Sequence, residues 1–310
     1  MRLITFNTIE GARHIGVALP DEAAVVDLTA AADVPYFADM LALIDGGNPA
    51  LDHARGLEVS GPRRPADEVR LLAPLPEPRQ MRDFLSFETH LRQARANRGL
   101  VVPTDMPSDP AKIQIPQVWY DQPIYYKCNR FAVVGPEQDV LWPRYAKLLD
   151  YELEFGIVIG KTGKNIPRSE ASGYIFGYCI FNDVSARDAQ LREMAGQLGP
   201  CKGKDFDTGN VLGPWLVTAD CVPDPYALEM TAHVNGELWS RGMSGEMHHS
   251  FETMIEHVSC DETLHAGEFF GSGTVGNGCG LELGRFLSPG DVMELEVSGL
   301  GKLRNRIVGQ

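Results

Sequence analysis

The stretch YELEFGIVIG (151–160) decides the fold, because it combines an apolar run with two acidic residues. A run of this kind predicts a buried β-strand. Side chains of a strand alternate between two faces, so Glu152 and Glu154 share one face with Cα atoms roughly 6.6 Å apart. Two carboxylates about 4 Å apart repel by about 4 kcal/mol at an effective dielectric of ~20. A hard divalent cation such as Mg2+ or Ca2+ would offset this repulsion.

A second apolar run extends the predicted site. YIFGYCIFND (174–183) ends at Asp183, just before SARDAQLREMA (185–195), which has helical spacing. An aspartate at the carboxyl end of a strand projects from the rim of the sheet, so with the two glutamates it predicts an oxygen-only metal site. Arg187 and Gln190 follow Asp183 by four and seven residues, which on a helix places all three on one face. Arg187 would offer a carboxylate a fork and Gln190 a neutral donor in the adjacent pocket.

An ordinary solvated face is the alternative interpretation of the paired glutamates. VMELEV (292–297) carries Glu294 and Glu296 in strict alternation with apolar residues, which is typical of an exposed face. In 151–160 the face of the glutamates continues instead with Gly156 and Val158. Spacing alone leaves both interpretations open.

Composition limits the classes of function. The chain has 310 residues, 44% hydrophobic and 23% charged, as in an ordinary globular protein. The net charge of −14 disfavours nucleic acid and anionic membranes as partners, and no segment has the ~20 apolar residues of a membrane helix. MRLITFNTIE lacks the apolar segment of a secretory signal. Six scattered cysteines without a C-x-x-C pair indicate a reducing cytoplasm.

The organisation along the chain predicts two regions. Residues 1–70 read as a small β-rich region with a helix over 37–46 that stops at two glycines. The proline-rich and charged stretch 61–78 marks the boundary to a core over 71–310. A helix is expected over 87–97.

Three further features of the sequence either leave their role open or argue against a functional site. Residues 99–123 hold five prolines, which fits an ordered lid, a partner contact or a plain surface loop. GSGTVG (271–276) has dinucleotide-site glycines, but no helix follows it, so that interpretation fails. Asp188 and the adjacent His248 and His249, whose side chains should diverge, are expected at the surface.

Five motifs in order carry a family resemblance: DYELEFGIVIG, NDVSARDAQ, GKDF at 203–206, GSGT at 271–274 and PGDVMELEVSGLGKLRNRIV. Together they resemble the fumarylacetoacetate hydrolase family, from about Leu71 to the C-terminus. The resemblance implies an α+β, mainly β fold built on a rolled mixed β-sheet, with a small N-terminal β-rich region. It also implies a homodimer.

The resemblance assigns roles to an upstream segment and a downstream glutamate. In RDFLSFETHLRQA it implies that Asp83 is a further metal ligand and that His90 is the general base. In CGLELGRF it implies that Glu282 pairs with His90, which would fix the imidazole tautomer. A satisfied histidine and an exposed strand glutamate are the alternatives. The family has a substrate-contacting tyrosine where this chain has Leu85, so fumarylacetoacetate is not expected as substrate.

The remaining implied site residues are one lysine and three substrate contacts. The GKDF match selects Lys204, which would point at the metal and substrate oxygens, over the neighbouring Lys202. Gly273, Thr274 and, by a weaker match, Tyr126 would bind substrate.

These expectations converge on one activity. The chain is expected to be a metal-dependent hydrolase that cleaves a carbon–carbon bond in a small β-diketo or acylpyruvate-type acid, using Mg2+, with Mn2+ or Ca2+ as alternatives. A 2-oxo acid decarboxylase, or a 2-oxo-alkenoate hydratase or isomerase, could use the same site. A metal-binding protein without catalysis is a third possibility, although it would not need a base.

Overall fold

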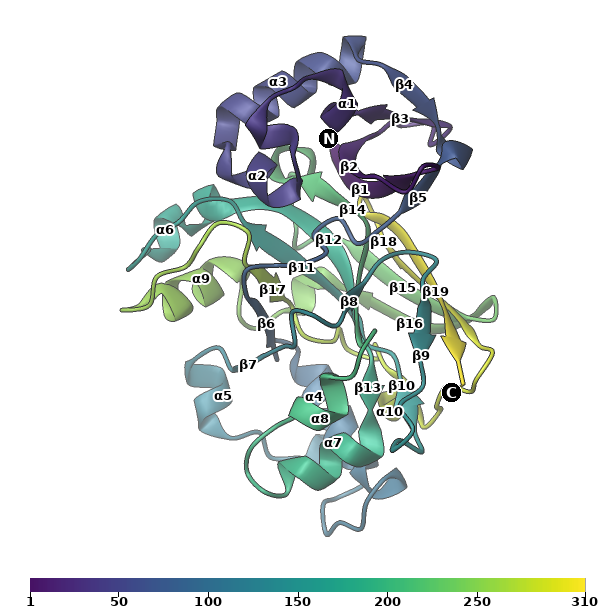
Figure 1. Ribbon diagram of the computed structural model, residues 1–310. Coiled ribbons are helices and arrows are strands. Elements are labelled where there is room, and N and C mark those ends of the chain that lie inside the picture. The colour runs from purple at the N-terminus through teal and green to yellow at the C-terminus, as the bar shows by residue number, and fades with distance from the viewer. Residues whose placement is uncertain (310) are drawn as a thin grey trace.

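The computed structural model describes residues 1–309 and contains more strand than helix (Figure 1). Its largest element is a twelve-stranded sheet, mostly antiparallel but with parallel pairs, which confirms the expected mixed, mainly β architecture. Its order is β4 (Arg63–Pro65), β3 (Ala24–Asp27), β2 (Arg13–Ala18), β1 (Arg2–Thr8), β14 (Asn210–Thr218), β12 (Ile175–Asp183), β11 (Leu153–Ile159), β17 (Phe269–Gly271), β6 (Met81–Phe84) and β7 (Tyr125–Lys127), with β5 (Val69–Leu71) on β1 and β8 (Val133–Val134) on β14.

Two smaller sheets complete the strand content. On the five-stranded sheet, Glu294 and Glu296 are half-buried and each lies 3.2 Å from Lys302 Nζ, in keeping with the outward face expected for them. That sheet has the order β16 (Glu237–Met243), β15 (Glu229–Val234), β18 (Val292–Val297), β19 (Gly301–Val308) and β9 (Asp139–Leu141), and the two-stranded sheet pairs β10 (Leu149–Asp150) with β13 (Ser185–Ala186).

The N-terminal strands extend the main sheet, because Arg2 of β1 pairs with Val217 of β14. Helices α1 (Leu28–Ala31), α2 (Met40–Asp45) and α3 (Gly47–Ser60) lie with them at one end of the molecule (Figure 1). The helix expected over 37–46 is the shorter α2, which does end at the first glycine. The second glycine does not end the helical region, since α3 begins there. The boundary near residue 70 stays a prediction.

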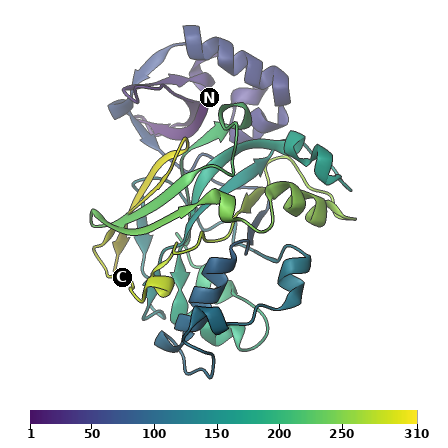
Figure 2. The same cartoon turned by 180° about the vertical axis from the view of Figure 1, so that it is seen from behind.

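Most of the remaining helices lie at the end of the molecule opposite the N-terminus in both views (Figure 2). The helices expected over 87–97 and 185–195 are present with slightly shorter bounds. Within residues 1–309, no helix is both long and apolar enough to cross a membrane. These elements are α4 (Glu88–Ala96), α5 (Gln117–Asp121), α7 (Arg187–Met194), α8 (Cys201–Lys204) and α10 (Gly280–Leu283), whereas α6 (Arg168–Ala171) and α9 (Phe251–Ser259) lie side by side against the sheet.

Strand β11 separates the two hydrophobic cores. All seven of its residues are buried. Phe155 and Ile157 belong to one apolar cluster, whereas Val158, on the opposite face, belongs to the other. Gly156 lies on the same face as Val158, where a side chain would meet Phe269 of β17. Glu154 therefore continues a fully buried face, which excludes the solvated interpretation of this strand.

We predict that Gly156→Ala destabilises the protein by about 1–3 kcal/mol, because overpacking a filled core costs this much. A Cβ at this position would lie 2.3 Å from Phe269 Cζ and 2.5 Å from the Phe270 carbonyl oxygen. The midpoint of urea unfolding measures the effect. Gly173→Ala is the control, since its Cβ would meet only Lys161 Nζ at 3.8 Å. Equal midpoints for the two variants would contradict this packing.

Candidate active site

Four buried carboxylates converge where the central strands end. Asp83 lies on β6, Glu154 lies on β11, and Asp183 is the last residue of β12. Glu152 precedes β11 and forms an isolated backbone β-bridge with Cys279. One oxygen of each lies within 4.8 Å of those of the others. We call Asp83, Glu152, Glu154 and Asp183 the carboxylate cluster.

A glycine makes room for the cluster. Gly271 of β17 pairs with Asp83 on one side and with Gly156 of β11 on the other. A Cβ at Gly271 would lie 2.5 Å from Asp83 Oδ1. The absence of a side chain at this position therefore lets Asp83 reach across β17 toward the carboxylates of β11.

Two buried cations offset part of the negative charge. Lys204 Nζ lies 2.5 Å from Glu152 Oε2 and 2.6 Å from Asp183 Oδ2, and Arg187 Nη1 lies 2.8 Å from Glu152 Oε1. Burial alone would raise the pKa of Glu152, but Lys204 and Arg187 lower this pKa to about 2. Burial alone would lower the pKa of Lys204, but Asp183 and Glu152 raise it above its ordinary value.

Asp83 and Glu154, the other half of the cluster, form no ion pair with a lysine or arginine within residues 1–309. Burial raises the pKa of Asp83 and of Glu154 well above their usual range, and repulsion by neighbouring carboxylates raises both further. Their oxygens accept hydrogen bonds from the backbone N–H of Gly273 at 3.3 and 3.0 Å, and the Thr274 hydroxyl donates to Glu154 at 3.2 Å. These neutral donors do not compensate the charge.

The donor set fits a hard divalent cation. Its ligand atoms are all carboxylate oxygens, the chemistry that Mg2+, Mn2+ and Ca2+ prefer. Asp183 Oδ1 is buried and has no hydrogen-bond partner within residues 1–309. An orphaned buried oxygen beside three further carboxylates is explained by a cation between them.

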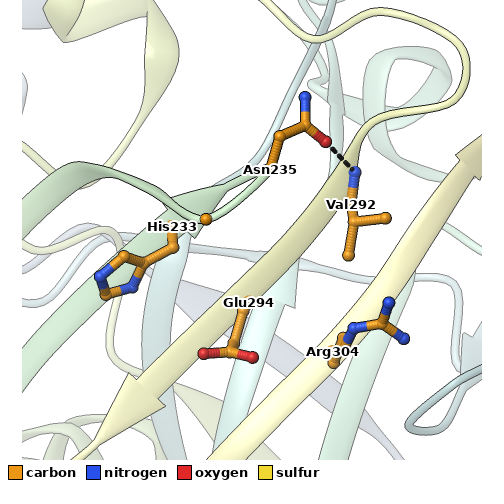
Figure 3. A pocket seen from close by; sticks show the side chains of 6 residues that line it. His233, Asn235, Val292, Glu294 and Arg304 are labelled. Carbon is orange, nitrogen blue, oxygen red and sulfur yellow. Dashed lines mark hydrogen bonds between the residues drawn. The ribbon is translucent and has the colours of Figure 1, made fainter.

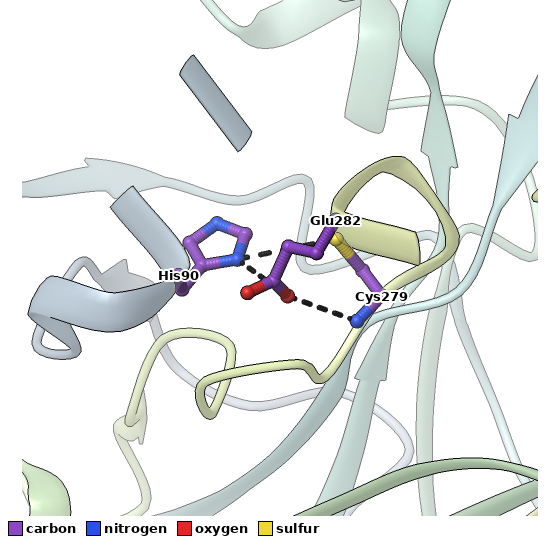
Figure 4. Close-up of side chains that lie close together, drawn as sticks. All are labelled: His90, Cys279 and Glu282. Atoms are coloured by element: carbon purple, nitrogen blue, oxygen red, sulfur yellow. Dashed lines mark hydrogen bonds and ion pairs between the residues drawn. The ribbon is translucent and has the colours of Figure 1, made fainter. Parts of the chain in front are cut away.

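A histidine and a glutamate, His90 and Glu282, lie against each other (Figure 4). His90 Nδ1 lies 3.0 Å from Glu282 Oε2, and both side chains are buried. The backbone N–H groups of Asn277 and Cys279 donate to the two oxygens of Glu282 at 2.9 and 3.1 Å. A carboxylate held this way accepts the Nδ1 proton, which leaves His90 Nε2 as the hydrogen-bond acceptor. We call His90 and Glu282 the His–Glu dyad; Glu282 lies on α10 and not on an exposed strand.

Sequence reasoning missed Asp150, which links the cluster to the dyad. Its carboxylate accepts from Arg187 Nε at 2.8 Å and from the backbone N–H groups of Gly280 and Leu281 at 2.7 and 2.9 Å. Those two groups open α10, the helix that carries Glu282. Asp150 precedes Glu152 by two residues, so extending the period of two by one step would have found it.

The five residues expected to bind substrate lie beside the cluster, and their roles stay predictions. Arg187, Gln190, Thr274 and Tyr126 line a cavity of about 440 Å³ that also contains His90, Lys204 and three of the cluster carboxylates. Arg187 Nη1 donates to Gln190 at 3.0 Å, and its buried Nη2 has no partner within residues 1–309. The Tyr126 hydroxyl donates to Asp183 at 2.6 Å, and Gly273 contacts the cluster through its N–H.

Two details of the sequence interpretation around α7 are wrong. Asp183 does not share a helical face with Arg187 and Gln190, because it ends β12 and β13 intervenes before α7. Asp188 is buried, since its carboxylate accepts from the backbone N–H of Lys147 and Leu148.

The histidine pair 248–249 also differs from expectation. His249 is buried, and its Nε2 donates to the Trp119 carbonyl oxygen at 2.7 Å, whereas His248 is exposed as expected. The two rings do not diverge, because their centroids lie 4.6 Å apart. Both contact the ring of Trp119, in the proline-rich segment 99–123.

A second hollow lies on the five-stranded sheet (Figure 3). His233, Glu294 and Arg304 line it, and Asn235 accepts a hydrogen bond from the Val292 N–H at 3.0 Å. Its ionisable groups come from the outward faces of strands and do not converge on a point. The cavity beside the carboxylate cluster is therefore the candidate active site.

Comparison with known proteins identifies the family of this chain. The family model described as fumarylacetoacetate (FAA) hydrolase C-terminal matches residues 81–308. The chain is 31% identical over 99% of its length, and 92% of the relative's, to the mitochondrial oxaloacetate tautomerase Fahd2a of Rattus norvegicus.

Solved structures show the same fold over the full length of this chain. The fumarylacetoacetate hydrolase of Exiguobacterium antarcticum has a TM-score of 0.77 at 27% identity, with 100% of both chains covered. The 5-carboxymethyl-2-hydroxymuconate delta-isomerase of Mycobacterium smegmatis has a TM-score of 0.72 at 25% identity, again with 100% of both chains covered. The chain therefore belongs to the fumarylacetoacetate hydrolase family.

Proposed function

We propose that this protein is a metal-dependent hydrolase that cleaves a carbon–carbon bond in an acylpyruvate-type β-diketo acid. One observation carries the proposal: His90, oriented by Glu282, lines the same cavity as the carboxylate cluster. A base held beside an electrophile-binding site is the arrangement that activated-water chemistry requires. A protein that only stores a cation would have no use for the dyad.

The carboxylate cluster would hold one divalent cation, most simply Mg2+. Bound there, the cation would supply Lewis-acid polarisation of the substrate's carbonyl groups. Lys204 remains beside Glu152 and Asp183, where its ammonium stabilises negative charge that develops on substrate oxygen. Arg187 Nη2, which has no partner within residues 1–309, is available to a substrate oxygen.

The dyad would move the protons of the reaction. His90 Nε2 takes a proton from water while the water oxygen attacks the carbonyl remote from the 2-oxo group, and Glu282 stabilises the imidazolium. The bond between that carbonyl carbon and the methylene carbon then breaks, and its electron pair stays on the methylene carbon. His90 returns the proton to this carbon. The products are a carboxylic acid and a 2-oxo acid.

Keto–enol tautomerisation of an oxaloacetate-type acid is the second candidate function. The observation that favours it is the 31% identity, over nearly the whole chain, to an oxaloacetate tautomerase. In this reaction His90 would take a proton from carbon and an oxygen would receive one, without attack by water. The same residues serve both reactions, so the fate of water distinguishes them.

We predict that Mg2+ raises the unfolding temperature of metal-free protein, because a ligand that binds only the folded state stabilises it. At about 100 times the dissociation constant the shift should be roughly 5 °C. Differential scanning calorimetry measures it. Glu154→Gln should remove most of the shift, whereas Glu294→Gln, from the glutamate pair on the outward face of β18, should keep it. An equal shift in both variants would place the cation elsewhere.

We predict that His90→Ala lowers kcat by about 10²–10⁴-fold, the usual contribution of general acid–base catalysis. The double variant His90→Ala/Glu282→Gln should be little slower than His90→Ala, because residues that act as one unit are not additive. Steady-state kinetics with a cleaved acylpyruvate provides the values. His248→Ala, an exposed histidine, is the control. Losses that multiply in the double variant would show that the two residues act separately.

We predict that cleavage of an acylpyruvate in oxygen-18 water labels the released carboxylic acid, because water supplies its new oxygen. Mass spectrometry detects the label, and prior removal of metal with EDTA should abolish cleavage until Mg2+ is returned. Rapid enol–keto exchange of oxaloacetate, with no cleavage of any acylpyruvate, would favour the second function.

Fumarylacetoacetate should not be the best substrate, since the Leu85 side chain in the cavity has no polar group that could donate a hydrogen bond to it.

A further inference from the structure

A buried thiol lies against the His–Glu dyad (Figure 4). Cys279 Sγ lies 3.9 Å from His90 Nδ1, the same ring nitrogen that lies 3.0 Å from Glu282 Oε2. All three side chains are buried, and one nitrogen, one sulfur and one oxygen from them lie within 4.8 Å of one another. We call His90, Cys279 and Glu282 the mixed-ligand site.

The spacing of these atoms matches a tetrahedral zinc ion. Zn2+ binds nitrogen and carboxylate oxygen at about 2.0–2.1 Å and thiolate sulfur at about 2.3 Å. In a tetrahedron these bond lengths separate nitrogen from oxygen by roughly 3.3 Å and nitrogen from sulfur by roughly 3.6 Å. The observed separations are 3.0 and 3.9 Å. Side-chain shifts of a few tenths of an ångström would therefore seat the ion.

The backbone already holds the three ligands in place. Cys279 directly precedes α10, the helix that carries Glu282. The N–H groups of Asn277 and Cys279 donate to the Glu282 carboxylate, and the Asn97 side chain, at the end of α4, donates to the Glu282 carbonyl oxygen at 2.8 Å. This contact joins α10 to α4, the helix of His90. Ligands on two connected helices lose little freedom when a metal binds.

We propose that His90, Cys279 and Glu282 bind Zn2+, and that zinc bound there inhibits the enzyme. Thiolate and imidazole are ligands that zinc prefers, whereas Mg2+ and Ca2+ prefer oxygen, so this site and the carboxylate cluster select different metals. A thiolate and a carboxylate together neutralise the ion, as a buried site requires. His90 and Leu281 line the cavity, which gives the ion a route.

The inhibition follows from the single proton of a neutral imidazole. In the dyad this proton lies on His90 Nδ1, beside Glu282, which leaves Nε2 free to accept a proton from water. Zinc would take the lone pair of Nδ1, so the ring proton would move to Nε2, and the thiol proton of Cys279 would leave to solvent. His90 in that tautomer is no longer a base. The inhibition rests on the proposed function, whereas the binding of zinc does not.

Cobalt spectroscopy tests the site without relying on turnover. Co2+ replaces Zn2+ in tetrahedral sites, and a thiolate ligand gives it a charge-transfer band in the near ultraviolet. Co2+ added to the protein in excess Mg2+ should produce this band, and Zn2+ should abolish it. Co2+ in the carboxylate cluster would lack the band, because the ligands there are all oxygens. Isothermal titration calorimetry with Zn2+ in excess Mg2+ measures the affinity.

Variants assign the zinc to the mixed-ligand site. Cys279→Ser and Cys279→Ala should both abolish the band and weaken Zn2+ binding by at least about 100-fold, since losing a ligand costs more than the roughly 10–100-fold effect of losing an outer partner. His90→Ala should also weaken binding. Cys260→Ser, at an exposed thiol, is the control and should change neither result. A band that persists in both Cys279 variants, or no band in the wild type, would overturn the proposal.

Activity measurements separate the zinc site from the proposed reaction. Zn2+ should lower kcat for acylpyruvate cleavage in the wild type and in Cys260→Ser over the concentrations at which it binds. Cys279→Ser, compared with its own zinc-free rate, should need at least about 100-fold more Zn2+. If zinc binds through Cys279 but no acylpyruvate is cleaved, the zinc site stands and the hydrolase proposal fails. If cleavage occurs and no Cys279-dependent zinc binding exists, the zinc site alone fails, and if cleavage continues with zinc bound, its inhibitory role fails.

Discussion

The need to bury four carboxylates side by side shapes the rest of the structure. At about 4 Å and an effective dielectric of ~20, each pair of charges repels by about 4 kcal/mol. The protein offsets this on one side only, where Lys204 and Arg187 contact Glu152. On the other side the pKa values of Asp83 and Glu154 are raised instead, so the site keeps a demand for positive charge. A folded chain that maintains such repulsion has kept a binding site at the expense of its own stability.

The same charges position the catalytic base. Arg187 contacts Glu152 of the carboxylate cluster and Asp150, and Asp150 accepts the first N–H groups of α10. That helix holds Glu282, which in turn holds His90. The electrophilic end of the site and its base are therefore joined by one continuous set of hydrogen-bonded groups, all of them buried. A displacement of Arg187 would disturb both the carboxylate cluster and the His–Glu dyad. Most of the N–H groups of Arg187 are accordingly used in contacts with the protein.

Local periodicity predicted part of this arrangement and long-range contacts decided the rest. The pairing of Glu152 with Glu154 follows from the alternation of a strand, and the strand that ends at Asp183 was visible as an apolar run. The motifs shared with the family then supplied Asp83, 69 residues upstream of the first glutamate. No local pattern could reveal that Asp150 caps a helix 130 residues away.

Burial of polar residues escaped prediction for the same reason. Asp188 and His249 looked like surface residues because their own segments are polar. Their partners, the Lys147 backbone and the Trp119 carbonyl, lie 41 and 130 residues away in sequence. The candidate active site depends on the same kind of contact. Helix α4, which carries His90, and the central strands, which carry the carboxylates, are distant in sequence and enclose one cavity.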